Sequence, residues 1–165
     1  MHGPHGGGHS LSTDLLSHLR QQAFEAEHTL ELQACGALRD FIARVGSARS
    51  EVIEFVLLDP GSLAPEMRAH PEAGLGKAID DLRVPYIDVH DTFGNGLECC
   101  TGLHKPPVAT VIINGNIESS YRIGLRLALR RLDSRRLTPP YQRMRNPSVP
   151  FTACESPKCS SPVDA

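Results

Sequence analysis

The sequence predicts one soluble α/β domain, built on a parallel sheet with helices on both faces. Segments with the pattern of strands alternate along the chain with segments of helical periodicity, at a spacing that suits βαβ units. One strand segment, Glu54–Leu58, is apolar without alternation, which is typical of a strand buried on both faces. The domain is expected to span residues 11–136, and its periodic pattern runs from Leu11 to Leu132.

Helices are expected where apolar residues recur at spacings of three and four. Ser12 can cap the first helix, and Asp14 lies in its first turn, where a carboxylate favours the helix dipole. The last helix is expected over Ser119–Leu132. The apolar faces are Leu11, Leu15, Leu16, Leu19 and Ala23 in the first helix; Leu38, Phe41, Ile42 and Val45 in the second; Leu75, Ala78, Ile79 and Leu82 in the third; and Tyr121, Leu125, Ala128, Leu129 and Leu132 in the last.

Four strands are expected, at Thr29–Gln33, Glu54–Leu58, Pro85–Val89 and Val108–Ile113. The second ends at an Asp-Pro-Gly turn. The stretch that follows, Ser62–Gly74, is polar and interrupted by proline, so it is expected to be a connection rather than an element.

The two ends of the chain differ in composition from this domain. Residues 1–10 are rich in glycine and histidine and are expected to form a flexible loop, whereas residues 137–165 are rich in proline and serine and are expected to be a disordered tail. The N-terminal stretch lacks the pattern of a signal peptide, and no apolar run is long enough to cross a bilayer. A cytoplasmic location is therefore expected.

Charge and cysteine content exclude several classes of protein. A formal net charge of -2 gives no field that would gather nucleic acid or an anionic membrane, so neither is expected as a partner. The five cysteines are an odd number, and a reducing compartment makes a disulfide framework unexpected. They are Cys35, Cys99, Cys100, Cys154 and Cys159.

Polar side chains follow the expected strands, and ligands bind at the carboxyl ends of strands in an open parallel sheet. Asp88 lies two residues before His90, on the same side of its strand. A carboxylate beside an imidazole raises its pKa, which would make His90 a proton donor or a carboxylate binder. The alternative is a histidine satisfied by a backbone carbonyl. The strand ends together suit a polar, hydroxylated ligand, and they offer Gln33, Cys35, Asp59, Asp88, His90, Asp91, Thr92, Asn114 and Asn116.

Two further patterns have an ordinary structural alternative. The turn Asn114–Asn116 precedes the last helix, where backbone N–H groups can hold an anion, but an asparagine cap on a plain turn explains it equally well. Arg122, Arg126 and Arg130 form a stripe on that helix, which is most simply a solvated face or a subunit interface.

No metal and no cofactor are expected. His2, His5 and His9 have the composition of a metal-binding tract, but nothing in the sequence orders them. Cys99–Cys100 with His104 is also a poor zinc set, because adjacent cysteines seldom bind one ion.

The order of these motifs resembles the type II 3-dehydroquinate dehydratases over residues 3–132. The most specific match is Val84–His90, Val-Pro-Tyr-Ile-Asp-Val-His, which is similar to that family's Ile-Pro-Val-Ile-Glu-Val-His. Leu58–Gly61 resembles its Ile-Asn-Pro-Gly, and Gln33–Cys35 resembles its Gln-Ser-Asn. Gly3-Pro4-His5 resembles its Asn-Gly-Pro-Asn turn after the first strand.

The resemblance implies a flavodoxin-like sheet, a homo-oligomer of trimers packed into dodecamers, and a small polar carboxylate as substrate. The family removes water from 3-dehydroquinate in the shikimate pathway, which leads to aromatic amino acids. It takes a proton next to a ketone and expels a hydroxyl through an enolate, without metal or organic cofactor. Together with the strand ends, the resemblance suggests His90, Asp88 and Asp59 as catalytic residues. It leaves Gln33, Cys35, Asp91, Thr92 and Asn114 for substrate binding.

Parts of the family's catalytic pattern have no counterpart. Its lid bears a tyrosine base and an arginine, and no such segment lies between Gly8 and Ser12. The tyrosines of this chain, Tyr86, Tyr121 and Tyr141, occupy a strand, a helix and the tail. The family's Thr-His-Thr-Ser is replaced by a stretch in which His70 is a weak substitute, and an arginine of a later loop is missing.

The family's first strand also has no counterpart, because the chain starts at Met1 with too few residues before Gly3 to form it. An absent inner strand would expose two rows of backbone groups, so either the sheet closes around the gap or the strand lies upstream.

Three hypotheses remain open: a lyase acting on 3-dehydroquinate with a different base; a divergent relative that uses Asp59, Asp88 and His90 on another small hydroxylated carboxylate; and a non-catalytic oligomeric scaffold.

Overall fold

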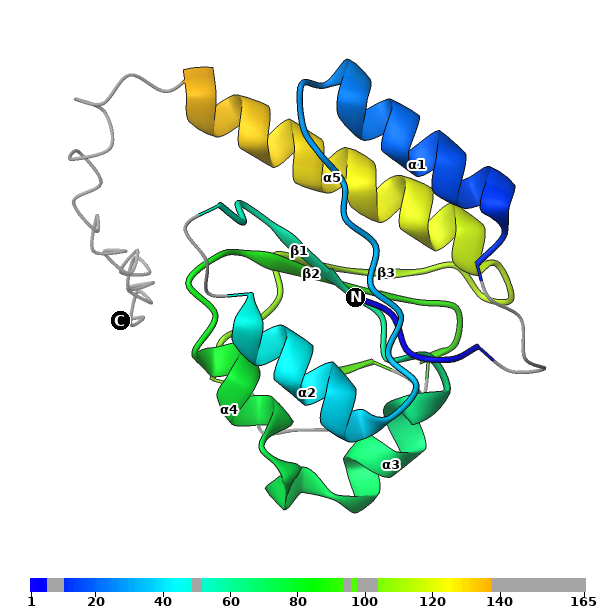
Figure 1. Cartoon of the computed structure of the whole chain (residues 1–165), viewed down its shortest axis with the longest axis vertical. Coiled ribbons are helices and arrows are strands. Elements are labelled where there is room, and N and C mark those ends of the chain that lie inside the picture. Colours follow the sequence, from blue (N-terminus) through cyan, green and yellow to red (C-terminus); the bar gives the residue numbers. More distant parts are fainter. Residues whose placement is uncertain (6–10, 49–51, 94–95, 98–103, 138–165) are drawn as a thin grey trace, which may run out of the picture.

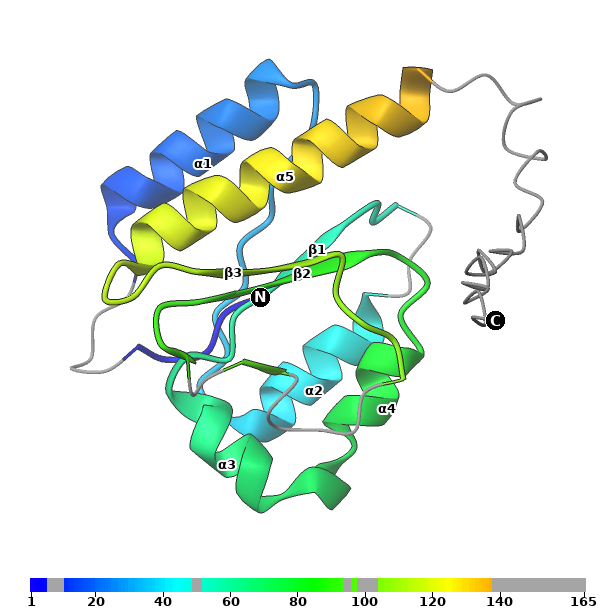
Figure 2. The ribbon, with the colours of Figure 1, turned by 180° about the vertical axis from the view of Figure 1, so that it is seen from behind.

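The computed structural model describes residues 1–5, 11–48, 52–93, 96–97 and 104–137. Figure 1 shows three layers, with a parallel sheet between a pair of helices, α1 and α5, and a second group, α2, α3 and α4. The view from behind shows the same division (Figure 2). The predicted α/β fold class is confirmed. The elements are α1 (Thr13–Glu25), α2 (Leu38–Ser47), β1 (Val56–Leu58), α3 (Ala64–Ala69), α4 (Leu75–Asp80), β2 (Tyr86–His90), β3 (Ala109–Ile112) and α5 (Ile117–Leu137), with short 3-10 turns at Gly61–Leu63 and Pro71–Ala73.

The sheet has the order β1-β2-β3, and all of its strands are parallel. The N-terminus extends it beyond β1, because His2 bridges in parallel to Asp59 on one side and to Ala34 on the other. Residues 1–3 therefore occupy the position of the first strand. The prediction of a flexible loop is wrong for residues 1–5, because His2 is bridged by backbone on both of its sides, to Ala34 and to Asp59. Residues 6–10 lie outside the described residues.

The apolar side chains divide between two cores, one on each side of the sheet. β2 supplies both, since Tyr86 packs with the α2, α3 and α4 layer, whereas Ile87 and Val89 pack with α1 and α5. All five residues of β2 are buried, as expected for an inner strand of a parallel sheet. The ends of this strand are therefore held rigidly from both faces.

Residues 29–33 do not form the predicted strand. Among the described residues, the backbone pairing of this segment is with His2, which bonds to Gln33 and Cys35 and bridges to Ala34. The second predicted strand is shortened to β1, which pairs with β2 over Val56–Leu58.

Helices form where the sequence indicated only a connection. Pro65 lies in the first turn of α3, where a missing N–H costs nothing, so proline begins this helix rather than interrupting it. The predicted caps are confirmed: the hydroxyl of Ser12 accepts from the N–H of Leu15 at 3.2 Å, and Oδ1 of Asn116 accepts from the N–H of Ser119 at 2.9 Å.

α5 continues to Leu137, beyond its predicted end. The rest of the predicted tail, residues 138–165, lies outside the described residues, as do Cys99, Cys100, Cys154 and Cys159. Within the described ranges, no helix combines the length and apolar character needed to span a membrane.

Candidate functional site

Asp59 is the centre of a buried polar cluster at the carboxyl end of β1. Its Oδ1 accepts a 3.0 Å hydrogen bond from the N–H of Gly61. Its Oδ2 accepts a 2.7 Å hydrogen bond from the hydroxyl of Tyr121 on α5, and Nε2 of His5 lies 3.0 Å from the same oxygen. One carboxylate thus joins the N-terminal segment, β1 and α5.

Two glycines allow the N-terminal segment to cross the turn after β1. A Cβ on Gly3 would lie 2.1 Å from the carbonyl oxygen of Pro60, and one on Gly61 would lie 2.3 Å from that of Pro4. Gly61 also has a φ of +53°, in the left-handed region that favours glycine. This close backbone crossing places His5 over the carboxylate.

The charges of the cluster assign different roles to its two other side chains. The hydrogen-bonding interaction with Asp59 raises the pKa of His5 above the ordinary value, despite partial burial. Burial, reinforced by Asp59, raises the pKa of the Tyr121 phenol well above its ordinary value. Tyr121 therefore stays protonated and donates to Asp59, whereas Asp59 favours the protonated form of the His5 imidazole.

Asp88 and His90 lie close together at the end of β2, as predicted, with Nε2 of His90 3.5 Å from Oδ2 of Asp88. Oδ2 of Asp88 also accepts the N–H of Leu97 at 2.9 Å, and Nδ1 of His90 lies 3.1 Å from the carbonyl oxygen of Thr92. The His90 side chain is only 2% exposed. A Cβ on Gly96 would lie 3.2 Å from its Cε1, so the chain covers the ring closely.

Burial lowers the pKa of His90, the opposite of the direction expected from the sequence. Asp59 and Asp91 act to raise it, but desolvation of the imidazolium outweighs both. The sequence argument was wrong because it considered the neighbouring carboxylate without knowing how completely the ring is enclosed.

The two histidines share an electrostatic environment. Asp59 and Asp91 both favour the charged forms of His5 and His90, so the two imidazoles feel the same two carboxylates. Thr92 is exposed beside them, and its hydroxyl donates to Oδ1 of Asp91 at 3.2 Å.

The remaining predicted binding residues are not all brought to this cluster. Gln33 donates to Glu31 at 2.6 Å and lines a separate cavity. Cys35 is buried in the core beside α2, where desolvation raises the pKa of its thiol. Asn114 is exposed in the turn before α5. The cap formed by Asn116 confirms the structural explanation of that turn.

Comparisons with known proteins point in one direction, although no family model matches the chain. Enzymes named 3-dehydroquinate dehydratase are similar to it: that of Pseudomonas savastanoi is 27% identical over 124 residues, covering 69% of this chain and 73% of the relative. That of Marinobacter nauticus is 28% identical over 127 residues, covering 76% and 83%. The crystal structure of type II dehydroquinase from Propionibacterium acnes shares the fold, with a TM-score of 0.57 at 16% identity, and covers 78% of this chain and 94% of its own.

This chain is similar to enzymes named 3-dehydroquinate dehydratase, and it shares the fold of a type II dehydroquinase.

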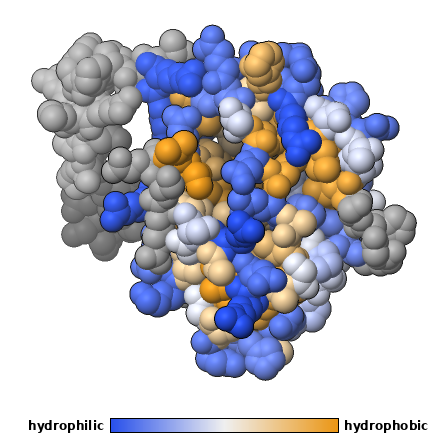
Figure 3. Space-filling view, in the orientation of Figure 1, coloured by the Kyte–Doolittle hydropathy of each residue, from blue (hydrophilic) through white to orange (hydrophobic). Residues whose placement is uncertain are grey.

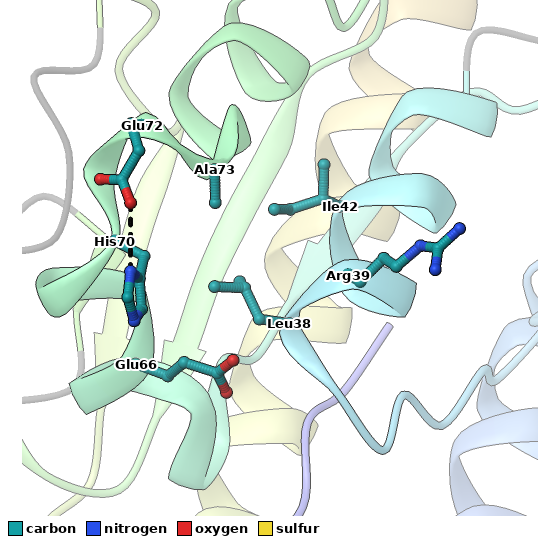
Figure 4. A pocket seen from close by; sticks show the side chains of 7 residues that line it. All are labelled: Leu38, Arg39, Ile42, Glu66, His70, Glu72 and Ala73. Atoms are coloured by element: carbon teal, nitrogen blue, oxygen red, sulfur yellow. Dashed lines mark hydrogen bonds and ion pairs between the residues drawn. The ribbon is translucent and has the colours of Figure 1, made fainter.

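A second cavity of this protein, of about 360 Å³, lies between α2 and the segment that follows α3 (Figure 4). His70 lies in its wall, with Nδ1 3.1 Å from Oε1 of Glu72. Arg39 points away from that pair in Figure 4. The suggestion that His70 substitutes for a catalytic histidine is not supported, because it faces this cavity on the α2 side.

Sequence reasoning missed two members of the Asp59 cluster. His5 was considered as part of a histidine tract and of the Gly3-Pro4-His5 turn but was not assigned to the site, although that turn was the signal that could have placed it at a strand end. Tyr121 was assigned to the apolar face of its helix, which is correct, but nothing in the sequence shows that its hydroxyl reaches Asp59.

Among the described residues, no group of three or more His, Cys, Asp or Glu side chains could hold a metal ion.

Proposed function

We propose that this protein is a lyase that removes water from a small hydroxylated keto acid of the 3-dehydroquinate type. The observation that carries the proposal is the His5–Asp59 pair at the carboxyl end of β1. The names of the similar enzymes support the substrate class.

The reaction needs a group that accepts a proton and can give one back. The C–H bond next to the ketone breaks, its electrons pass through an enolate into a carbon–carbon double bond, and the C–OH bond breaks. The hydroxyl leaves with a proton as water. A carboxylate that raises the pKa of a histidine makes its neutral imidazole a stronger base, and the imidazolium that forms can return the proton, which suits both proton transfers.

His5 takes the place of the tyrosine base in this proposal. Asp59 orients the imidazole and stabilises its charged form, and Tyr121 fixes the carboxylate by its hydrogen bond. Tyr121 does not act as the base, because burial and Asp59 both oppose its ionisation.

The other predicted residues support the site in different ways. Asp91, Thr92 and Asn114 belong to the ends of β2 and β3 and present polar groups suited to substrate hydroxyls. His90 and Asp88 are buried, and they are positioning residues: Asp88 accepts the N–H of Leu97 and so holds the segment that covers His90.

A homo-oligomer is part of the same proposal. Val108, Ile123 and Leu127 remain 38 to 40% exposed, and Val108 and Leu127 line one surface cavity between β3 and α5 that is also lined by Arg130, Arg131 and Arg135. Burying such a patch against another copy is the simplest use of it. Sedimentation velocity tests this, with one multimeric species expected and a single monomeric species contradicting it.

Turnover of 3-dehydroquinate tests the proposed reaction. We expect the purified chain to generate the absorbance of the enone product. His5→Gln should lower kcat by about 10²-fold or more, the usual contribution of a general acid or base. His18→Gln is the matched control, since this exposed histidine on α1 lies with its Nδ1 2.8 Å from the carbonyl oxygen of Asp14, and it should leave kcat unchanged.

Two negative outcomes have different meanings. If the chain forms no enone and 3-dehydroquinate does not raise its melting temperature, the proposed activity fails. Stabilisation by a different hydroxylated carboxylate would then favour a divergent substrate, and the absence of any response would favour a scaffold.

A further inference from the structure

The imidazole of His2 stacks on the imidazole of His5, beside the Asp59 cluster. The two ring centroids lie 6.0 Å apart and the ring planes differ by 16°, which is the offset stacking that aromatic rings favour. Both residues are half-buried. His2 therefore lies against the side chain that is proposed to transfer the proton, and its own part in the site has not yet been accounted for.

The backbone of His2 is held from both sides. Its N–H donates to the carbonyl oxygen of Gln33 at 2.9 Å, and its carbonyl oxygen accepts from the N–H of Cys35 at 2.8 Å. The segment that carries Gln33 and Cys35 runs between α1 and α2, where a hydrophilic strip crosses the middle of the face shown in Figure 3. On the other side, His2 bridges to Asp59. The stack is therefore built on a fixed backbone.

The ring of His2 is neutral under conditions in which that of His5 is protonated. Burial is the main cause that lowers the pKa of His2, and the amine of Met1 and the imidazole of His5 lower it further, against the carbonyl of Gly3 and the carboxylate of Asp59. Nδ1 of His2 lies 3.1 Å from the carbonyl oxygen of Gly3, which fixes the plane of the ring. A neutral ring can stack on an imidazolium without like-charge repulsion.

The orientation of the His5 ring decides which of its nitrogens can reach a substrate. Nε2 lies 3.0 Å from Oδ2 of Asp59, so the neutral imidazole carries its proton on Nε2 and its lone pair on Nδ1. Asp91 is the second carboxylate whose charge raises the pKa of His5. Within the described ranges, no hydrogen bond or ion pair involves Nδ1 of His5. A His5 ring that turned about its Cβ–Cγ bond would push its edge into His2, so the stack opposes the loss of this orientation.

We propose that His2 is a positioning residue, whose ring holds the His5 imidazole with Nε2 on Asp59 and so leaves Nδ1 as the nitrogen that exchanges the proton with the substrate. This inference rests on the proposed function, in which His5 is the base. Nδ1 takes the proton from the carbon next to the ketone, and the electron pair of that C–H bond passes into the enolate. As the enolate forms the double bond, the C–OH bond breaks and Nδ1 returns the proton to the hydroxyl, which leaves as water. His5 is then neutral again, and His2 takes up no proton.

NMR titration of His5 in two variants of the full chain tests this role without any substrate. In His2→Ala the His5 ring loses its support and its steady contact with Asp59, so its midpoint should fall by about half a pH unit or more. His2→Phe keeps an aromatic ring in the stack and should keep the midpoint at or above the wild-type value. A neighbour that acted by charge alone would give the opposite result in His2→Ala, because removing a like charge raises the midpoint. An unchanged or raised midpoint in His2→Ala would overturn the proposal.

Turnover of 3-dehydroquinate by the same variants links the stack to the reaction. His2→Ala should lower kcat about tenfold or more, because a misplaced base loses the alignment that proton transfer needs. Its KM should stay within about twofold of the wild-type value, since His2 does not touch the substrate. His2→Phe should recover most of kcat, and His18→Ala, the matched control at an exposed histidine of α1, should leave kcat unchanged. Wild-type kcat in His2→Ala, or an equal loss in His2→Phe, would contradict positioning by the ring.

Two measurements on the wild type keep the proposal testable if His2→Ala does not fold. A nuclear Overhauser effect should join the ring protons of His2 and His5, and ¹⁵N shifts above the midpoint should show neutral His5 with its proton on Nε2. The absence of this effect, or a proton on Nδ1, would overturn the proposal. A wild-type chain that forms no enone contradicts the proposed function, whereas turnover that His2→Ala leaves unchanged contradicts this inference alone.

Discussion

The hydroxyl of Tyr121 donates a 2.7 Å hydrogen bond to Oδ2 of Asp59, which joins α5 to the end of β1 across 62 residues of sequence. Both residues are almost completely buried. The bond satisfies two polar groups that would otherwise be costly inside the protein, and it fixes the carboxylate that His5 contacts.

Removing this hydroxyl should destabilise the fold. Tyr121→Phe leaves a buried carboxylate with one donor fewer, so we expect a loss of about 1–3 kcal/mol in the free energy of unfolding. Tyr86→Phe is the matched control, because Tyr86 is equally buried but donates to the backbone carbonyl of Lys105 at 2.8 Å. It should cost about 0.5–1.5 kcal/mol. Urea denaturation measures both, and a smaller loss for Tyr121→Phe than for Tyr86→Phe would contradict this account.

The crossing of the N-terminal segment over the turn after β1 should depend on Gly61. Gly61→Ala combines a contact of 2.3 Å to the carbonyl oxygen of Pro4 with a positive φ, so we expect a loss of ~2–5 kcal/mol. Gly36→Ala is the control, since a Cβ there meets nothing within 4 Å. It should change the free energy of unfolding by less than about 0.5 kcal/mol. Equal effects of the two substitutions would show that the crossing is not close.

Histidine titration should separate the two histidines of the site. In an NMR titration, the midpoint of His5 is expected above the ordinary value of 6.5 and that of His90 below it. Asp59→Asn should lower the midpoint of His5, because the carboxylate is the main cause of its raised pKa. A His5 midpoint below 6.5 in the wild type would remove the basis for its proton transfer.

These shifts act in opposite directions on stability. The folded state favours protonated His5, so the stabilisation by this pair is complete below pH 6.5 and is lost as the pH rises through the folded pKa. The folded state favours neutral His90, so its contribution is present above pH 6.5 and is lost as the pH falls through that value towards the lowered pKa. As the pH rises, the free energy of unfolding should therefore fall less in His5→Gln than in the wild type. Urea denaturation at several pH values measures this difference.

Much of the fold follows from patterns that act locally. Apolar periodicity and the Ser12 cap define α1, and the unbroken apolar run before Asp59 indicates an inner strand. Residues 29–33 show where this reasoning stops. Leu30 and Leu32 alternate as in a strand, but a strand also needs a partner, and within the described ranges the bridge to this stretch is that of His2 with Ala34.

The candidate site was predictable only in part, for a similar reason. Asp59, Asp88 and His90 stand directly at strand ends, so the sequence order places them together. The contacts of Asp59 with His5 and Tyr121 depend on the backbone crossing at Gly61 and on the packing of α5, which join distant parts of the chain. The enclosure of His90 by Gly96 is equally non-local, and it reverses the direction of the pKa shift.

The initial rate of enone formation from 3-dehydroquinate, compared between two aspartate variants, tests the central claim most directly. Asp59→Asn should react about 10²–10⁴-fold more slowly than the wild type. The reason is the loss of the carboxylate that orients the His5 imidazole and stabilises its charged form. Asp80→Asn should keep the wild-type rate, since Asp80 pairs with the exposed His104 at 2.9 Å, away from the Asp59 cluster. A wild-type chain that forms no enone, or equal rates for the two variants, would contradict the role assigned to the His5–Asp59 pair.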